Sequence, residues 1–334
     1  MRVVFDSRDA EAPDLRGWGR YARELARSLN GLSEVELVQL GKGWRGVPEV
    51  AYEQLGLARA ARKAGADLLH VPNCFLPLHR GGLPGVVTIH DLAFEVFPRD
   101  FAPLTRRKFT HITPRAARDA EAVIVPSGFT ASDVIDRYGV DAERVYVVPE
   151  APALPQGTDT GPSMEYLLGV GDLRAKKNWE RLVRAWRRLR EEHELPHELI
   201  IAGIDAGEKN ALRRAAGDHP LGLPGYVSDT VLDGLIRGAD VLVHPSLYEG
   251  FGLVILEAMV RGTPVAAARG TSLTEAGGDA AVYFDPESED ELGSAILEAL
   301  SNAEDLRDLG HTHAAKYTWE RAATATAHVY RQVL

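Results

Sequence analysis

The chain has 334 residues but a single cysteine, Cys74, which excludes an internal disulfide and any metal site built from several cysteines. No uncharged apolar run reaches 18 residues, so the sequence contains no candidate for a membrane-spanning helix. The N-terminal stretch Met1–Asp9 becomes charged again after only three apolar residues. We therefore expect no signal peptide, and we expect a cytoplasmic protein.

Excess positive charge is also missing. Lysine and arginine number 38 against 48 aspartates and glutamates, which gives a net charge of −10. Residues 1–150 hold 20 basic and 20 acidic residues, whereas residues 151–334 hold 18 and 28. Neither half is basic enough for nucleic acid to be the expected partner. The different charge of the two halves indicates two modules.

The apolar fraction of 45% and the charged fraction of 26% are those of an ordinary globular protein, and the length predicts about two domains. Residues 151–163 contain three prolines and two glycines without apolar periodicity, which is typical of a linker. On both sides, short apolar runs alternate with amphipathic segments. This pattern predicts the α/β class, with two Rossmann-like parallel-sheet domains and a cleft between them.

The expected strands cover residues 3–5, 35–40, 66–71, 86–89, 122–125 and 145–148 in the first half, and 166–170, 198–202, 225–227, 241–244, 264–267 and 281–284 in the second. The clearest expected helices cover residues 17–29, 179–189, 252–261 and 318–334. In such sheets ligands bind beyond the carboxyl ends of the strands, so the loops that follow strands are where we expect the chemistry.

The first motif is Gly17-Trp18-Gly19-Arg20-Tyr21-Ala22, formally G-x-G-x-x-A. A dinucleotide fingerprint would have its glycines immediately after the first strand and an acidic residue after the second, and neither is present. A glycine-rich start of a core helix is one alternative. The other is a helix start whose backbone N–H groups approach an anionic ligand closely.

The second motif is His90-Asp91, at the end of a strand expected to be buried. A neutral imidazole in this place can bind a substrate hydroxyl, with Asp91 setting its tautomer. A histidine with a purely structural role is the alternative.

The third motif, residues 169–178, places Arg174, Lys176 and Lys177 between a strand and a helix. We expect Asn178 to cap the helix that begins at Trp179. Basic side chains beside a helix N-terminus form an anion site, although a solvated basic loop is an equal alternative. No G-x-x-x-x-G-K-[ST] segment occurs, so this is not a P-loop.

The fourth and most specific motif runs from His244 to Met259. Glu249 follows an expected buried strand, and Glu257 lies roughly 8 Å inside the following helix at 1.5 Å per residue. The amides at the start of that helix can bind an anion. A carboxylate in an apolar helix is costly without donors, and ribose hydroxyls would supply them. The alternative is two ordinary glutamates at a helix end.

Glu249 and Glu257, in the spacing E-x7-E with Gly-Phe-Gly between them, resemble the signature of the retaining GT-B glycosyltransferases of family 4. The resemblance covers nearly the whole chain. Several independent motifs carry it in the same order, at residues 17–21, 90–91, 127–130, 177–178, 225–229, 262–264 and 272–275.

The resemblance implies an acceptor-binding domain over residues 1–152, a nucleotide-sugar-binding domain over 153–317 and a C-terminal helix, 318–334, that crosses back to the first domain. As catalytic residues it implies Lys177 on the diphosphate, Glu249 on donor sugar hydroxyls and His90 near the reacting centre. The donor-binding residues that it implies are Gly17, Gly19, Arg174, Lys176, Tyr226, Val227, Gly250, Phe251, Gly252, Leu253, Val254 and Glu257, the last on the ribose.

Two departures from the family pattern stand out. Many relatives carry arginine at the position of Asp172 as a second diphosphate ligand, and Arg174 or Lys176 is the candidate replacement here. The segment Val148–Ala151 lacks the Asn-Gly often found there and has Glu150 instead.

We therefore expect a hexosyltransferase of the EC 2.4 class that transfers a hexose with retention to an acceptor hydroxyl. Residues 90–94 and the Lys-Asn loop most resemble mannosyltransferases, so GDP-mannose is the first expected donor and a UDP-sugar the next. No Asp-x-Asp occurs, and we expect neither a metal nor a further cofactor. The sequence leaves open whether the acceptor is a sugar, a lipid-linked sugar or a small molecule, and it leaves open the oligomeric state.

Basic residues at 106–108, 115 and 118 leave peripheral contact with the inner membrane face open. Three other functions remain as alternatives. The G-x-G-x-x-A motif allows an NAD(P)-dependent dehydrogenase. A two-domain sugar-binding protein without catalysis and a nucleotide-sugar epimerase are the other two.

Overall fold

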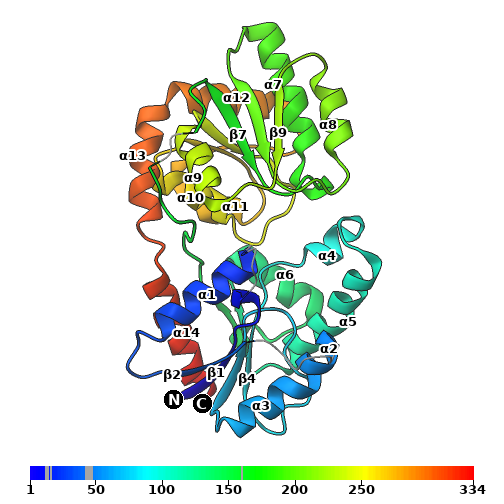
Figure 1. Ribbon diagram of the computed structural model, residues 1–334, viewed down its shortest axis with the longest axis vertical. Coiled ribbons are helices and arrows are strands. Elements are labelled where there is room, and N and C mark those ends of the chain that lie inside the picture. Colours follow the sequence, from blue (N-terminus) through cyan, green and yellow to red (C-terminus); the bar gives the residue numbers. More distant parts are fainter. Residues whose placement is uncertain (12–14, 16, 42–47, 159–160) are drawn as a thin grey trace. The chain divides into compact units, whose positions relative to one another are not determined.

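The computed structural model describes residues 1–11, 15, 17–41, 48–158 and 161–334. These residues form two compact units, one of Met1–Ala153 with Tyr317–Leu334 and one of Leu154–Lys316 (Figure 1). Each unit is built on a parallel sheet covered by helices, so the predicted α/β class with two Rossmann-like sheets is confirmed.

In the first unit the described strands pair in the order β2-β1-β3-β4-β5-β6, all parallel. Their bounds are β1 Arg2–Asp6, β2 Glu36–Leu40, β3 Leu68–Val71, β4 Gly85–Thr88, β5 Ala122–Val125 and β6 Val145–Val147. Strands β3, β4 and β5 are buried at every position because helices cover both faces of the sheet.

The longer helices of this unit are α1 Gly17–Leu29, α3 Leu57–Lys63, α5 Pro103–Asp119, α6 Gly128–Tyr138 and α14 Trp319–Val333. Shorter turns are η1 Asp9–Glu11, α2 Glu49–Ala51, η2 Tyr52–Gly56, α4 Ala93–Val96, η3 Pro98–Asp100 and η4 Ala142–Arg144. The segment η2 has π-helical geometry.

The C-terminal helix α14 packs beside α1, as the red and blue helices in Figure 1 show. Its small residues Ala323 and Ala327 lie in one apolar cluster with Tyr21 and Leu25 of α1. The helix begins where Thr318 Oγ1 accepts a hydrogen bond from the amide of Arg321. The first unit is therefore built from two parts of the chain, and residues of α14 form part of its core.

In the second unit the described strands pair in the order β12-β11-β10-β7-β8-β9, again all parallel. Their bounds are β7 Tyr166–Val170, β8 Glu198–Ala202, β9 Leu221–Gly225, β10 Val241–His244, β11 Val265–Ala268 and β12 Val282–Phe284. The helices are η5 Ala175–Lys177, α7 Trp179–His193, α8 Lys209–Ala216, α9 Asp229–Gly238, α10 Leu253–Val260, α11 Leu273–Gly277, η6 Gly278–Ala280, α12 Glu289–Ser301 and α13 Ala303–Ala314.

The strand order of the second unit reverses direction between β7 and β10. From β7 the chain proceeds outward to β8 and β9, and from β10 it proceeds the other way to β11 and β12. The loops that follow two neighbouring strands at such a point diverge and leave a crevice that binds ligands. In this unit those loops carry the third and fourth motifs.

The strand predicted at residues 225–227 is wrong. Strand β9 covers Leu221–Gly225 instead, a segment whose proline and two glycines are typical of a turn. It forms the edge of the sheet, where a proline that donates no hydrogen bond is tolerated. Gly225 has a φ of 80°, which ends the strand before Tyr226.

Candidate active site

The loop after β7 and the loop after β10 meet through Lys177 and Glu249. Lys177 Nζ donates a hydrogen bond to Glu249 Oε1 at 2.5 Å, and Lys176 Nζ lies 3.6 Å from Glu249 Oε2. The amide of Leu247 also donates to the carbonyl of Lys176 at 2.8 Å. The reversal of strand order between β7 and β10 thus brings together the third and fourth sequence motifs.

The two lysines keep Glu249 ionised. Burial alone would raise the pKa of Glu249, but the charges of Lys176 and Lys177 outweigh it and hold the pKa well below its usual range. His244, the last residue of β10, faces the same carboxylate, with Nε2 at 3.3 Å from Oε1. Burial and the charge of Lys177 lower the pKa of His244, so its imidazole is neutral near pH 7. Two lysine side chains therefore face one partly buried carboxylate.

Of the two replacements considered for the family's arginine, Lys176 reaches this cluster. Its side chain is 12% exposed and lies against Glu249. Arg174 is 31% exposed, and its Nε lies 3.5 Å from Asp172 Oδ2. Asp172 also accepts a hydrogen bond from the amide of Ile204. Arg174 is therefore paired with Asp172, the residue that replaces the family's arginine.

The predicted side-chain cap by Asn178 is wrong. Asn178 precedes α7 in the left-handed conformation, with a φ of 58°, and its side chain makes no cap hydrogen bond. Its Nδ2 instead donates to the carbonyls of Pro245 and Pro286, at 3.1 and 2.8 Å. Asparagine is one of the few residues that enters this conformation readily. Asn178 therefore joins the loops after β7, β10 and β12.

The start of α10 has the tight geometry expected from its glycines. Gly252 has a φ of 107°, and a Cβ there would lie 2.8 Å from Leu273 Cδ2, so only glycine fits. The buried Gly250 and Phe251 lead into this turn, and Ser272 Oγ donates to the carbonyl of Glu249 at 2.7 Å. The first amides of a helix, here at Leu253 and Val254, have no partner within the helix and attract anions.

Glu257 obtains hydrogen-bond donors from the protein, so its carboxylate has partners without a ribose. Arg261 Nη1 donates to Glu257 Oε2 at 2.7 Å, and the amide of Leu154 donates to Oε1 at 2.7 Å. Arg261 also binds Asp233 Oδ1 through Nε at 2.6 Å and the carbonyls of Leu154 and Pro155. A ribose would use the remaining lone pairs of the carboxylate.

His90 follows β4 in the first unit and is bonded through both ring nitrogens. Nδ1 lies 2.7 Å from Glu150 Oε1 and Nε2 lies 3.0 Å from the carbonyl of Pro72. Asp91 was expected to set the tautomer, and this is wrong: Asp91 Oδ1 accepts from the amide of Ala93. Both ring nitrogens of His90 therefore already have partners, and neither is left to bind a substrate hydroxyl as expected.

The two glycines of the first motif differ in their surroundings. A Cβ at Gly19 would lie 2.6 Å from the carbonyl oxygen of Asp9, so close packing of α1 on η1 requires glycine there. Gly17 begins α1, and a Cβ there would meet none of the described atoms within 4 Å. Close packing thus explains why residue 19 is glycine, in agreement with the alternative of a glycine-rich core helix. It does not explain the glycine at position 17.

The remaining predicted donor-binding residues, Tyr226 and Val227, follow the edge strand β9. Tyr226 is exposed, with 49% of its surface accessible. The predicted site residues therefore fall into two groups. His90, Gly17 and Gly19 belong to the first unit, and the others belong to the second.

In residues 1–11, 15, 17–41, 48–158 and 161–334, no group of three or more histidine, cysteine, aspartate or glutamate side chains is arranged to hold a metal ion. Within those same segments, no helix combines the length and apolar character that a membrane crossing needs.

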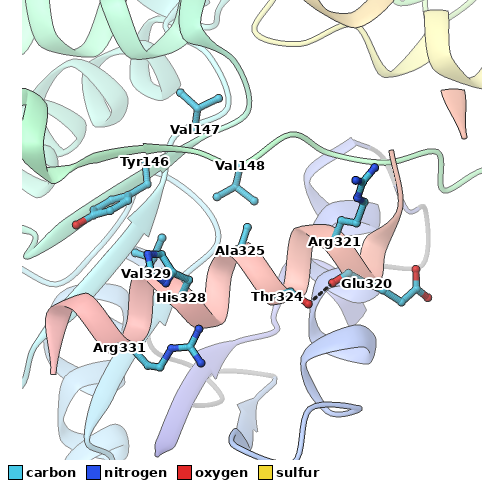
Figure 2. A pocket seen from close by; sticks show the side chains of 10 residues that line it. All are labelled: Tyr146, Val147, Val148, Glu320, Arg321, Thr324, Ala325, His328, Val329 and Arg331. Carbon is cyan, nitrogen blue, oxygen red and sulfur yellow. Dashed lines mark hydrogen bonds between the residues drawn. The ribbon is translucent and has the colours of Figure 1, made fainter. Parts of the chain in front are cut away.

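A groove of about 630 Å³ lies in the first unit, away from the motifs. Figure 2 shows it between β6, with Tyr146 and Val147, and α14, with Thr324 and His328. None of the predicted site residues lines it.

Three residues that bind the predicted site residues, or bind one of their partners, were not identified from the sequence. Glu150 was noted only as a departure from the family, and its 60-residue separation from His90 gave no sign of contact. Arg261, the C-cap residue of α10, stands four residues after Glu257, a spacing that could have indicated the pair. Asp233 comes from α9, and nothing in the sequence points to it.

The geometry is that of a GT-B glycosyltransferase, and solved structures share the fold. Sucrose-phosphate synthase from Thermosynechococcus elongatus matches with a TM-score of 0.75 at 20% identity, covering 99% of this chain and 98% of that one. The Anabaena protein HepE in complex with UDP and glucose matches with a TM-score of 0.70 at 18% identity, covering 99% and 100%.

Family profiles match both units. The profile for glycosyl transferases group 1 matches residues 155–315, and that for glycosyltransferase family 4 matches residues 15–151. The chain belongs to this family of glycosyltransferases and is an enzyme of the transferase class. Family membership sets aside the dehydrogenase, the epimerase and the non-catalytic sugar-binding protein.

Two of the similar curated proteins are mannosyltransferases. O-antigen chain mannosyltransferase B of Escherichia coli is 28% identical over 99% of this chain and 100% of its own length. The MMP alpha-(1->4)-mannosyltransferase of Mycolicibacterium hassiacum is 28% identical over 90% of this chain and 80% of its own. The chain is thus mannosyltransferase-like.

Proposed function

We propose that the protein transfers a hexose, in the first instance mannose, from a nucleotide-diphosphate sugar to an acceptor hydroxyl, with retention of anomeric configuration. The observation that supports this best is the contact of Lys176 and Lys177 with Glu249 beside the N-terminus of α10. Two partly buried cations and a helix start form a site for a diphosphate.

The departing diphosphate develops negative charge, and fixed positive groups that face it lower the barrier. When the donor binds, its phosphates replace Glu249 as the partner of Lys177, and the carboxylate turns to the hydroxyls of the donor sugar. Glu257 binds the ribose through its remaining lone pairs, and the backbone at Tyr226 and Val227 faces the base. The first unit binds the acceptor, with His90 near the reacting centre.

Transfer with retention proceeds by attack on the face from which the diphosphate leaves. The bond between the anomeric carbon and the phosphate oxygen breaks, the acceptor oxygen bonds to that carbon, and the acceptor proton passes to the leaving phosphate. No protein nucleophile is consumed, and Glu249 acts through its charge and hydrogen bonds. We propose that the reaction needs no metal ion, since the lysines and the start of α10 supply the positive charge.

GDP-mannose is the proposed donor because mannosyltransferases are among the similar proteins over nearly the full chain. The test is hydrolysis of GDP-mannose without acceptor, followed by proton NMR of the sugar as it is released, with EDTA present. We expect slow release of α-mannose, undiminished by EDTA, and its loss in Lys177→Ala. Release of β-mannose would refute retention. Turnover that requires added Mg²⁺ would refute metal independence, and turnover of UDP-glucose alone would refute the proposed donor.

We further propose a cytoplasmic enzyme that touches an anionic membrane surface through α5. Arg106, Arg107 and Arg115 are exposed there, next to Leu104, which is 82% exposed. Lys108, grouped with them in the sequence, instead contacts Glu53 and lies over the ring of Phe75. Co-sedimentation with vesicles containing phosphatidylglycerol tests this, and equal binding by an Arg106→Glu, Arg107→Glu double variant would refute it.

A further inference from the structure

His90 faces two hydrogen-bond acceptors. Nδ1 lies 2.7 Å from a carboxylate oxygen of Glu150, and Nε2 lies 3.0 Å from the carbonyl oxygen of Pro72. A carbonyl oxygen cannot donate, and an ionised carboxylate cannot either. With Glu150 ionised, both contacts are hydrogen bonds only when both ring nitrogens carry protons. The geometry is therefore that of an imidazolium between a carboxylate and a carbonyl.

The side chains around the ring favour the cation. Trp18 stacks on His90 with ring centroids 5.8 Å apart and planes at 19°, an arrangement that attracts a cation to the face of the indole. Tyr21 meets the ring edge-on at 4.6 Å. Both aromatic residues belong to α1, so the start of this helix packs against the ring of His90.

Among the described residues, the charged and titratable groups near His90 include Glu150, Asp91 on its own loop, Tyr21 on α1 and His70 on β3. The thiol of Cys74 also interacts with the backbone of His90. His70 is neutral, because burial lowers its pKa to about 3, and it is bonded to Tyr330 and Thr88. Burial would also lower the pKa of His90, but the hydrogen bond and charge of Glu150 outweigh it and raise that pKa above its ordinary value.

Glu150 is equally buried, with 5% of its surface exposed. It lies three residues after the end of β6, and its partner His90 lies two residues after the end of β4. A buried carboxylate is costly unless a cation and hydrogen bonds compensate it, and a protonated His90 supplies both to Glu150. In this pair the positive charge lies on the ring of His90, which is held in place just after the carboxyl end of β4.

We propose that Glu150 is a positioning residue for glycosyl transfer, which holds His90 as an oriented imidazolium at the reacting centre. The inference rests on the proposed function, which places His90 near the reacting centre. A ring that is positive before the donor binds stabilises the charge that develops on the leaving phosphate oxygen, without a proton transfer during the reaction. A glutamine in place of Glu150 carries no negative charge, so it no longer favours a second proton on the ring of His90.

The first measurement needs no substrate. In protein labelled with 15N-histidine, we expect the ring of His90 to carry protons on both nitrogens at pH 7.5, and to carry one in Glu150→Gln, with Glu150→Asp restoring two. His90→Gln assigns the signal. A neutral ring in the wild type, with the proton on Glu150 instead, would overturn the proposal.

The second measurement is the pH profile of donor turnover. We expect kcat of Glu150→Gln to fall at least about 10-fold, with the donor KM nearly unchanged, and its alkaline limb to move to lower pH. Glu150→Asp should recover most of kcat, while Glu143→Gln, an exposed control, should match the wild type. Equal melting temperatures by circular dichroism show that the variants fold.

The two possible failures are distinguishable. A wild type without turnover of any nucleotide-sugar refutes the proposed function and, with it, a role of Glu150 in turnover. An active Glu150→Gln variant with wild-type kcat and pH profile overturns the positioning role alone.

Discussion

Lys177 and Glu249 come from loops after two different strands, and their side chains meet at 2.5 Å between Nζ and Oε1. The strands β7 and β10 are 71 residues apart in the chain from the end of one to the start of the other, yet they are neighbours in the sheet. Their contact places the strongest motif of the sequence against the basic loop. Several expected results follow from this arrangement and from the residues around it.

Removing either partner of this contact should abolish most transfer while the fold is kept. We expect Lys177→Ala and Glu249→Gln to lower kcat by about 100- to 1,000-fold, the usual effect of losing one preorganised charged group at a reacting centre. Initial rates of GDP release from GDP-mannose measure this. Lys63→Ala, an exposed lysine of α3, is the control, and full activity in both site variants would refute the site.

Lys176 and Arg174 should differ in their effect on donor affinity. Lys176 lies against Glu249, whereas Arg174 is paired with Asp172. We expect Lys176→Ala to weaken binding of the donor roughly tenfold, or about 1.4 kcal/mol, and Arg174→Ala to change it little. Calorimetric titration of GDP measures both. The opposite order of effects would show that Arg174 is the second diphosphate ligand.

Asn178 should show a backbone effect and a side-chain effect that can be separated. Its φ of 58° costs an ordinary residue about 1–2 kcal/mol, whereas glycine adopts it freely. We expect Asn178→Ala to destabilise more than Asn178→Gly, since both lose the bonds to Pro245 and Pro286 and only alanine adds strain. Urea unfolding measures the difference, which equal losses would contradict.

Arg261 should be critical for stability. Its guanidinium is fully buried and binds the carboxylates of Asp233 and Glu257. Removal of one member of a buried ion cluster leaves uncompensated charge, and we expect Arg261→Met to cost about 3–5 kcal/mol in free energy of unfolding. Arg237→Met, a more exposed contact of the same Asp233, should cost less than about 1 kcal/mol. Similar losses in both variants would contradict this assignment.

Glu53 should give stability a dependence on pH. Burial raises its pKa to about 7, despite the opposing charges of Lys108 and Arg8. In the unfolded chain it titrates near pH 4.3, so folding takes up a proton between about pH 4.3 and pH 7. Stability therefore falls as the pH rises through this window and levels off above it.

The size of the Glu53 effect is up to about 4 kcal/mol. We expect the free energy of unfolding of Glu53→Gln to fall less steeply than that of the wild type between pH 5 and pH 7, with Glu143→Gln following the wild type. Denaturant titrations at several pH values measure it. Parallel curves for wild type and Glu53→Gln would show that Glu53 is ionised throughout.

The fold could be predicted because strands buried on both faces are continuous apolar runs and amphipathic helices repeat at 3.6 residues. The end of β9 could not, because proline and glycine in an edge strand look like a turn. Lys177 and Glu249 could be selected because each follows a buried strand. Their contact depends on the order of strands in the sheet, which is a tertiary property.

Side-chain partners were the least predictable part of the site. Asparagine is a common helix-capping residue. The left-handed backbone of Asn178 instead directs its side chain to the carbonyls of Pro245 and Pro286, which are distant in the sequence. Glu257 was expected to take its donors from a ligand, but Arg261, four residues further along the chain, donates to its carboxylate. His90 meets Glu150 only because β4 and β6 end at the same edge of the sheet.

The central claim is that the second unit binds a nucleotide-sugar through Lys177, and the most direct test is calorimetric titration of GDP-mannose into the wild type and Lys177→Ala. We predict saturable binding to the wild type that is at least about tenfold tighter than to the variant, or 1.4 kcal/mol. Titrations of UDP-glucose and NADH run beside it. Binding that is equal in wild type and variant, or a wild type that binds no nucleotide-sugar, would contradict the claim.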